Sequence, residues 1–573
     1  MSVFFNGRLL ITPTSASVVD DSALANRNLS VGNNVAFIGS SLGGKPNTVL
    51  TFGSPSEARA ALVSGELLDA VVKAFDPSAQ TNAPATVTAI RVNPATQAAL
   101  SLLDATPTAV INLVSTDYGA YNNQIKVKIE SGTNAGKKIT TQFGNSYFSA
   151  DDVARNAFSI QYTGGQATAT MSIGGTSLTL QAPTGTTVAT IDLTVYSTIQ
   201  QLVDKINTVS GFLGAAVLDG NGAKPALNGL DYVTNQDVRT ASYTATANLQ
   251  AVVDWFNGLG EGYVTATRVA GVGKVPANIA WTYLSGASDG TTTTTEWSNA
   301  FATLQSADVQ WVTPLTGNSA IHAMADSHVA YMSTVGKQER RAICGMVSGS
   351  TDAAAITAAK AINSDRTSLV HLGYYDYDAS GTLVLYPPYM LASLIAAAFA
   401  GVNPGTALTN KTLKVRGLER KLRNPTDTDV LIEGGVLCVE DTSTGYKVVK
   451  SISTWLTNDN YNRVEQSTGW ALDYVVRNVR QALDVLRGEK ISPLLLSRAV
   501  SLAKSQLDEL ARPEPAGPGV IVGDADNPAY INVRATAAGD VVRLEFQCSP
   551  AIPANYILTT VYAVPYSGTA TAS

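Results

Sequence analysis

Charged residues are scarce in this chain. Only 15% of its 573 residues are Asp, Glu, Lys or Arg, against roughly 25% in an average soluble domain. Lys and Arg number 39 and Asp and Glu 45, so the formal net charge is 39 − 45 = −6 at pH 7. The lack of a basic excess argues against a dedicated nucleic-acid binder, and the low net charge argues against a disordered acidic chain. Surfaces poor in charge suit contacts between subunits.

Cysteine and histidine are equally rare, with three of each. Widely spaced cysteines without a CxxC pair exclude a disulfide framework and a zinc ribbon, and we interpret them as small buried residues: Cys344, Cys438 and Cys548. His322 and His328 are six residues apart, which does not fit the i, i+4 pair of a helical metal site. No motif beside them or beside His371 indicates a catalytic triad. We therefore predict no catalytic residue, no metal site and no cofactor.

Long hydrophobic runs are also missing. The longest apolar stretch, residues 389–402, falls short of the ~20 residues that span a bilayer and has prolines on both sides. It predicts a buried core helix. The first residues lack a basic segment followed by an apolar one, so we expect no signal peptide and no membrane insertion.

A glycine-rich loop at residues 39–46 resembles two enzyme motifs. Residues 39–45 match GxxxxGK, but Pro46 stands where a P-loop needs Ser or Thr, and residues 47–52 read as extended. Residues 39–43 also match GxSxG, yet Gly44 and Pro46 exclude the helix that follows a nucleophile elbow. A surface turn explains the sequence better than a nucleotide or hydrolase site.

Alternating helix and strand patterns predict an α/β core made of two separated stretches, residues 26–95 and 248–440. Residues 35–39 and 87–92 read as buried strands, and Ser54 starts a helix that reaches about Phe75. Further apolar strand candidates lie at residues 309–315, 341–347 and 368–375.

Residues 96–247 change to period-two alternation and predict an inserted, mostly antiparallel β domain. Ile125, Val127 and Ile129 alternate with charged residues, and glycine pairs at 164–165 and 174–175 indicate hairpin turns. One amphipathic helix over residues 199–206 has Ser197 as its expected cap. We expect this insert to face outward, because insertions are tolerated on surfaces.

Residues 441–548 predict a C-terminal α+β domain. An apolar stripe from Leu472 to Leu486 indicates a helix over 468–487, a second helix starts at Ser492 and stops before Pro513, and residues 530–548 read as a hairpin. Three arginines fall off the first stripe and form either a partner-binding surface or a solvated helix face: Arg477, Arg480 and Arg487. The predicted fold class is thus α/β and α+β, multidomain.

Both chain ends are apolar segments on tethers. The N-terminal arm, residues 1–25, contains a strand or a small hairpin around Asn6–Gly7. In the C-terminal arm, residues 549–573, the stretch 556–564 is apolar on both faces and should be buried beside residues 541–548 of a neighbouring subunit. The candidate strand-exchange residues are Val3, Phe4, Phe5, Leu9, Leu10, Val542, Leu544, Phe546, Ile557, Leu558, Val561, Tyr562 and Val564.

Several stretches resemble the contractile tail sheath proteins of myophages and related contractile injection systems. The most specific is residues 386–411, and the others follow one another in the order typical of that family: 34–44, 311–324, 339–345, 363–370, 417–419, 431–441, 447–455 and 467–483. The PGVY-like start common in the family is replaced by SVFFNGRLLITP.

The resemblance implies a structural subunit and no enzyme. It would polymerise as stacked, hexameric rings around a tail tube and contract to drive the tube through a host envelope. The implied partners are other copies of the chain, the tail tube protein, and baseplate and tail terminator proteins, with no direct nucleic acid. The implied location is the tail sheath of a virion assembled in the bacterial cytoplasm. The resemblance also places the C-terminal domain at the smallest radius, with the three arginines facing the tube.

Alternative functions remain open from the sequence. The chain could belong to a phage-derived injection system, pyocin-like or secretory, instead of an infectious virion. An enzyme with an α/β core would need a polar pocket for which no motif is present, and a capsid or adhesin-like protein would not form hollow tubes.

Overall fold

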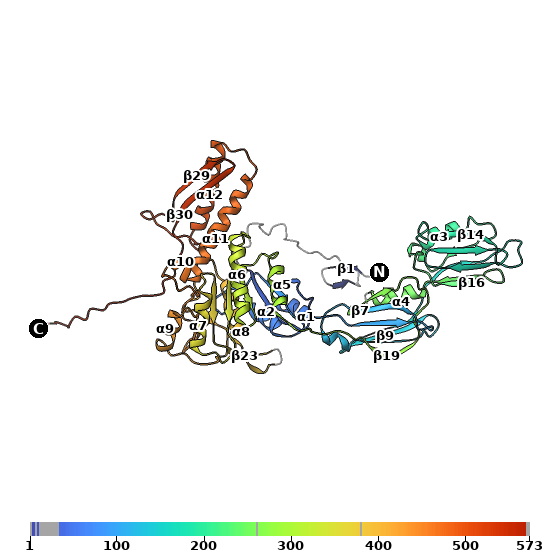
Figure 1. Cartoon of the computed structure of the whole chain (residues 1–573), viewed down its shortest axis with the longest axis horizontal. Coiled ribbons are helices and arrows are strands. Elements are labelled where there is room, and N and C mark those ends of the chain that lie inside the picture. Colours follow the sequence, from blue (N-terminus) through green and yellow to red (C-terminus); the bar gives the residue numbers. More distant parts are fainter. Residues whose placement is uncertain (1–2, 6–7, 11–33, 259–261, 379–380, 569–573) are drawn as a thin grey trace, which may run out of the picture.

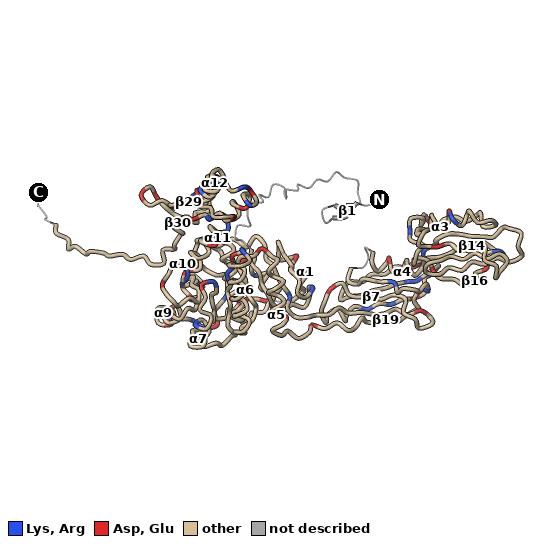
Figure 2. Tube along the Cα trace, turned by 45° about the horizontal axis from the view of Figure 1, so that its top comes forward, with Lys and Arg blue, Asp and Glu red and all other residues tan. Residues whose placement is uncertain are grey.

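The computed structural model describes residues 3–5, 8–10, 34–258, 262–378 and 381–568. Figure 1 shows a central body, an elongated insert that projects from one side, a C-terminal unit above the body, and a last segment that runs away from it. The broad prediction of a mixed α/β, multidomain fold is confirmed. Figure 2 shows charged residues thinly interspersed over the body, the insert and the C-terminal unit, and none on the last segment.

A six-stranded sheet forms the centre of the body, which we call the core. Its order is β22-β21-β20-β3-β5-β4. Five strands are parallel and β4 (Val49–Phe52) is an antiparallel edge. The parallel strands are β3 (Asn34–Gly39), β5 (Thr86–Arg91), β20 (Trp311–Pro314), β21 (Arg341–Gly345) and β22 (Thr367–Val370). Their near-continuous burial fits a sheet that is covered on both faces.

Helices cover the two faces of this sheet. One face packs on α2 (Glu66–Ala74) and α8 (Pro388–Ala400), and α1 (Pro55–Leu62) lies beside α2. The other face packs on α5 (Thr294–Leu304), α6 (Ser319–Thr334) and α7 (Asp352–Ile362). Every residue of α8 except Tyr389 is buried, and the Phe399 ring stacks on Trp311 at 4.4 Å between centroids, so this is the predicted core helix. None of the helices within the described residues has the length and apolar character that crossing a bilayer requires.

The helix predicted from Ser54 to about Phe75 is instead two helices. The Ser54 hydroxyl caps α1 by accepting from the Glu57 amide. The chain then breaks before α2 at Gly65, whose φ of +112° is a conformation that residues with a side chain rarely adopt.

Short strands complete the lower part of the core. One sheet has the order β24-β23-β26 and another β25-β28-β27, and α9 (Thr426–Glu433) lies between β26 and β27 in sequence. Their bounds are β23 (Tyr374–Tyr377), β24 (Leu383–Tyr386), β25 (Thr412–Leu413), β26 (Gly417–Leu418), β27 (Val439–Thr442) and β28 (Gly445–Val448). The predicted domain boundary at residue 441 falls inside the β27–β28 hairpin, where Asp441 pairs with Tyr446, so this hairpin belongs to the core.

The insert contains two units, each with its own apolar cluster. The inner unit holds the sheets β18-β7-β6 and β10-β9-β8-β19. Its elements are β6 (Ala99–Leu103), β7 (Ala109–Ser115), η1 (Ala120–Gln124), β8 (Lys126–Ser131), β9 (Lys137–Phe143), β10 (Ser146–Val153), α4 (Asn248–Phe256), β18 (Val264–Arg268) and β19 (Ile279–Tyr283).

The outer unit, residues 156–246, holds the sheets β15-β11-β17 and β14-β13-β12-β16. Its elements are β11 (Asn156–Ile160), β12 (Thr170–Ile173), β13 (Ser177–Gln181), β14 (Thr187–Asp192), α3 (Ile199–Ile206), β15 (Ala216–Val217), η2 (Asn221–Ala223), β16 (Val233–Asp237) and β17 (Tyr243–Thr246). Thr198, not Ser197, caps α3. Residues 164–165 do not form a hairpin turn, because β11 pairs with β15 and β17 whereas β12 pairs with β13 and β16.

The predicted insert boundary at residue 247 is wrong. β18 pairs with β7 and β19 pairs with β8, so residues 248–285 belong to the inner unit and not to the core. The error has a physical source: these antiparallel partners lie about 150 residues apart in sequence, and a local pattern does not report such a distant pairing.

The C-terminal unit begins with α10 (Tyr461–Val464) and α11 (Gln466–Leu483), followed by η3 (Asp484–Leu486), α12 (Pro493–Ala511), β29 (Tyr530–Ala538) and β30 (Val541–Cys548). The two predicted helices and the hairpin are present. The start of α11 is part of the core, since Trp470 packs edge-on against Trp311 at 5.3 Å between centroids.

Candidate assembly surfaces

The β29–β30 hairpin presents open strand edges. It is a two-stranded antiparallel sheet, paired from Tyr530↔Cys548 to Ala538↔Val541, with a register shift between Ile531 and Arg534. Residues of α12 and of the hairpin share one apolar cluster, so the helix covers one face. No further strand joins either edge within the part of the chain that the structure describes. Open edges of this kind are templates for strand addition.

The side chains predicted for strand exchange on this hairpin have contacts within their own subunit. Leu544 and Phe546 pack against the apolar cluster of α11 and α12 in their own subunit. Val542 and Leu544 line a groove of about 350 Å³ together with Leu483 and Leu495. What β30 can offer to a neighbour is therefore its backbone edge and this groove, and not an exposed row of apolar side chains.

The segment 556–568 leaves the body fully exposed. Residues 551–568 form no β-strand, because a chain segment without a neighbouring strand has no partner for ladder hydrogen bonds. Its large apolar side chains are between 77% and 96% exposed. They are Tyr556, Ile557, Leu558, Val561, Tyr562, Val564 and Tyr566. So much apolar surface on one segment marks an interaction site.

The root of this segment, in contrast, is fixed to its own subunit. The Ala551 amide donates to the Val520 carbonyl at 2.9 Å, and the Asn555 Nδ2 donates to Glu465 Oε2 at 3.1 Å. Burial raises the pKa of the Glu465 carboxyl to about 7, while Asn555, Lys450 and Ser467 oppose that rise. The chain is thus held in place as far as Asn555, and the Tyr556 ring still lies 5.6 Å from Lys450 Nζ, whereas the residues after it are exposed.

The N-terminal apolar stretch is a small hairpin. β1 (Val3–Phe5) pairs with β2 (Arg8–Leu10) in the register Val3↔Leu10, Phe4↔Leu9 and Phe5↔Arg8. Of the two alternatives left by the sequence, the structure selects the hairpin. The predicted Asn6–Gly7 turn and the rest of the predicted arm, residues 11–25, lie outside the described residues.

Two of the three arginines predicted to face a tube are used inside the subunit. Arg477 forms an ion pair with Asp308 and its side chain is only 14% exposed. Arg480 pairs with Glu339 and donates to the Lys337 carbonyl at 2.8 Å. Arg487, whose side chain is 83% exposed and paired with Asp484 three residues before it, is the most accessible of the three.

A buried ion cluster beside them had no signal in the sequence analysis. Asp473 accepts from Arg341 Nε at 2.8 Å and from Arg366 Nη2 at 2.9 Å. The apolar stripe predicted for this helix includes Val476, three residues after Asp473. In the structure Val476 is exposed and Asp473 is buried. The cluster joins α11 to the parallel sheet, so the C-terminal unit is tied to the core by charge as well as by packing.

The candidate catalytic and metal motifs have structural roles. Each histidine has a ring nitrogen within hydrogen-bond distance of a protein group: Thr316 O for His322, Arg340 Nη1 for His328 and Asp352 Oδ1 for His371. Burial, with the Arg340 charge, lowers the pKa of His328 to about 3. Within the described ranges, His, Cys, Asp and Glu form no group that could hold a metal ion.

The glycine-rich loop docks the insert. The Gly44 amide donates to Asp117 Oδ1 of the inner unit at 2.9 Å, and the Ser41 amide donates to Asn93 Oδ1 at 3.3 Å. A strand, β4, follows instead of the helix that a P-loop requires. The protein's own carboxylate thus binds an amide of the loop where a phosphate would bind in a P-loop.

The relatives found by comparison with known proteins are tail sheath proteins of phages. The chain is 30% identical over 521 residues to a putative tail sheath protein of Enterococcus phage phiEF24C, covering 87% of this chain and 89% of the relative. It is 28% identical over 585 residues to the tail sheath protein of Bacillus phage SP01, covering 99% and 98%. No protein-family model matches the sequence.

Solved structures share the fold. A sheath tail protein from Listeria innocua aligns with a TM-score of 0.56 at 12% identity, over 93% of this chain and 95% of the other. A sheath tail protein from Desulfitobacterium hafniense aligns with a TM-score of 0.51 at 12% identity, over 94% and 100%.

Proposed function

The chain belongs to the contractile tail sheath protein family, and we propose that it polymerises as stacked hexameric rings around a tail tube in a phage virion. The observation that carries the proposal is the combination, in one molecule, of an open-edged hairpin and an exposed apolar segment with a fixed root. A chain that carries both a strand and a place to add one can link to identical copies without closing on itself.

The C-terminal segment of one copy adds to the β29–β30 hairpin of the next. A strand of this length makes about five ladder hydrogen bonds, each worth roughly 1 kcal/mol net. Burying each large apolar side chain adds ~1.5–3 kcal/mol before the entropy of ordering is subtracted. The N-terminal hairpin is a second candidate for exchange.

Contraction is then a rigid-body rotation of the subunits between two packings of unequal free energy, while the exchanged strands keep the copies linked. The energy is stored in the first packing and not in a nucleotide or metal, so the protein acts as a structural subunit and not as an enzyme. The proposed partners are other copies of the chain, the tail tube protein, and baseplate and terminator proteins. The insert, directed away from the C-terminal unit in Figure 1, faces outward.

Truncation of the chain tests the role of the segment while leaving the rest of the fold in place. A chain ending at Asn555 keeps the Glu465 contact and loses all seven exposed apolar side chains. A matched control ends at Tyr566 and keeps them. We expect the control to form hollow tubes under the electron microscope and the shorter chain to stay as folded single subunits, checked by circular dichroism and sedimentation. Normal tubes from the chain ending at Asn555 would disprove strand exchange by this segment.

A further inference from the structure

The insert is joined to the core by two single-chain connections. One leaves the end of β5 and runs through residues 92–98, and the other returns through residues 285–293 to α5. Two such connections normally allow a domain to move relative to its neighbour. Here they are bonded to each other: the Thr96 amide donates to the Ser288 carbonyl at 2.9 Å, and the Ser288 amide donates to Thr96 Oγ1 at 2.9 Å.

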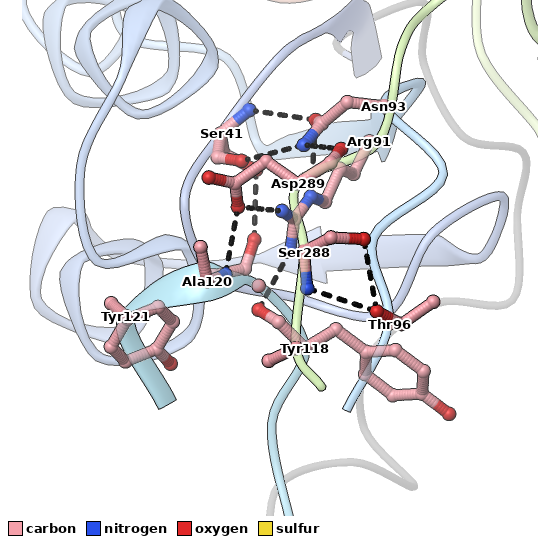
Figure 3. A network of polar contacts seen from close by, with 12 residues as sticks. Ser41, Arg91, Asn93, Thr96, Tyr118, Ala120, Tyr121, Ser288 and Asp289 are labelled. Carbon is pink, nitrogen blue, oxygen red and sulfur yellow. Dashed lines mark hydrogen bonds and ion pairs between the residues drawn. The ribbon is translucent and has the colours of Figure 1, made fainter. Parts of the chain in front are cut away.

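Arg91 lies at the centre of this junction (Figure 3) and is fully buried. Its Nε donates to Asn93 Oδ1 at 3.0 Å. Its Nη1 donates to the Gly44 carbonyl at 2.8 Å and to the Tyr118 carbonyl at 3.0 Å. Its Nη2 lies 3.4 Å from Asp289 Oδ1. One guanidinium group thus contacts the core loop, the loop between β7 and η1 of the insert, and both connections.

The partners of Arg91 are bonded to one another as well. Asn93 Nδ2 donates to the carbonyls of Ser41 and Asp289, each at 3.2 Å. Asp289 Oδ1 also accepts from the Ala120 amide at 3.1 Å, at the start of η1. These bonds join the core loop, the two connections and the insert, so a change of angle at the junction would break several at once.

Close backbone packing and charge reinforce the junction. Gly119 has a φ of +118°, and a Cβ placed on it would lie 2.3 Å from the Leu42 carbonyl oxygen, so the insert backbone touches the core loop directly. Burial lowers the pKa of Arg91, and the carboxylates of Asp289 and Asp117 oppose that change. The guanidinium keeps its charge because its pKa is so high. It compensates two carboxylates that face it from different segments.

We propose that the Arg91 junction holds the insert at one fixed angle to the core, so that the two move as a single rigid body. Arg91 and Asp289 are the positioning residues. Any change of packing between copies of the chain then has to occur at the terminal segments and at subunit surfaces, because the junction does not bend. The proposal concerns the single chain and does not rest on polymerisation.

Single-molecule energy transfer tests the proposal at picomolar concentration, where copies do not meet. Dyes are placed on the core and the insert through Ser306→Cys and Lys274→Cys, both exposed positions, in the full chain with Cys548→Ser. Cys344 and Cys438 are buried and should not react. The variants are Arg91→Met, Arg91→Lys and Asp289→Ala. Arg498→Met is the control, because it removes an exposed arginine whose ion pair with Glu489 lies in the C-terminal unit.

We expect one narrow transfer population for the parent chain and the control. Arg91→Met and Asp289→Ala should broaden or shift it, with unchanged circular dichroism, and Arg91→Lys should lie in between because lysine keeps the charge but not the fork of donors. If Arg91→Met fails to fold, Asp289→Ala decides, since the Asp289 side chain is 39% exposed. A broad population in the parent chain, or an unchanged narrow one in Asp289→Ala, would overturn the proposal.

Discussion

At the scale of single residues, buried charges carry the strongest predictions. Asp473 faces two guanidinium groups, and Asp473→Asn would remove the carboxylate that is ion-paired with the buried Arg341 and with Arg366. Removing one partner of a buried ion pair costs about 3–5 kcal/mol, whereas an exposed pair is worth about 0–1 kcal/mol. Urea unfolding followed by tryptophan fluorescence should therefore show a large loss for Asp473→Asn and almost none for Asp484→Asn, which only breaks the exposed pair with Arg487. Equal losses would contradict the cluster's role.

The raised pKa of Glu465 predicts that the free energy of unfolding depends on pH. Its carboxyl would lose a proton near pH 4.5 in the unfolded chain and only near pH 7 in the folded one. Between these values the unfolded chain binds fewer protons, so the free energy of unfolding falls as pH rises, by on the order of 3 kcal/mol in total. Glu465→Gln should match the parent at pH 4 and exceed it at pH 8. A constant difference between the two proteins from pH 4 to pH 8 would argue against this pKa.

The sequence did not reveal these residues for a physical reason. Arg91 ends a strand of apolar residues and Asp473 lies on an amphipathic helix, and each position looks like an ordinary polar end or face. Only the fold shows that the groups which compensate them arrive from far away: Asp289 lies 198 residues from Arg91, and Asp473 lies 132 residues from Arg341. The ion pairs of Arg477 and Arg480 could not be predicted for the same reason, because their partners Asp308 and Glu339 lie in another part of the chain.

At the scale of elements, locally encoded features could be predicted. The capping residue Ser54, the apolar helix at residues 388–400 and the 530–548 hairpin follow from neighbouring residues alone. The extent of the insert could not be predicted, since β18 and β19 depend on distant partners.

The structure shows which residues of the insert can be deleted without disrupting the rest of the chain. The ends of the outer unit meet, because the Ala247 amide donates to the Arg155 carbonyl at 2.9 Å. Replacing residues 156–246 by a short Gly-Ser linker should leave a soluble chain that still assembles. Removing residues 110–245 instead takes β7 through β9 away from β18 and β19 and should give insoluble protein. Comparing soluble yield and tube formation of the two deletion variants checks this. If only the variant that lacks residues 156–246 were insoluble or failed to assemble, the outer unit would be required for the rest of the chain to fold.

At the scale of the whole molecule, rigid and free parts are separated. Buried ion pairs tie the C-terminal unit to the core, and the Arg91 junction ties the insert to it. The apolar side chains from Ile557 to Tyr566, in contrast, are exposed. A protein built in this way is suited to moving as a block while remaining linked to its neighbours through strands.

The position of residues 556–564 in an assembled tube tests the central claim most directly. Cryo-electron microscopy of tubes formed by the full chain would resolve it. We predict that this segment lies in a ladder with the β29–β30 hairpin of a neighbouring copy, and that its root stays on Glu465 of its own subunit. Density that returns the segment to its own hairpin, or tubes in which it contacts no other copy, would contradict the account.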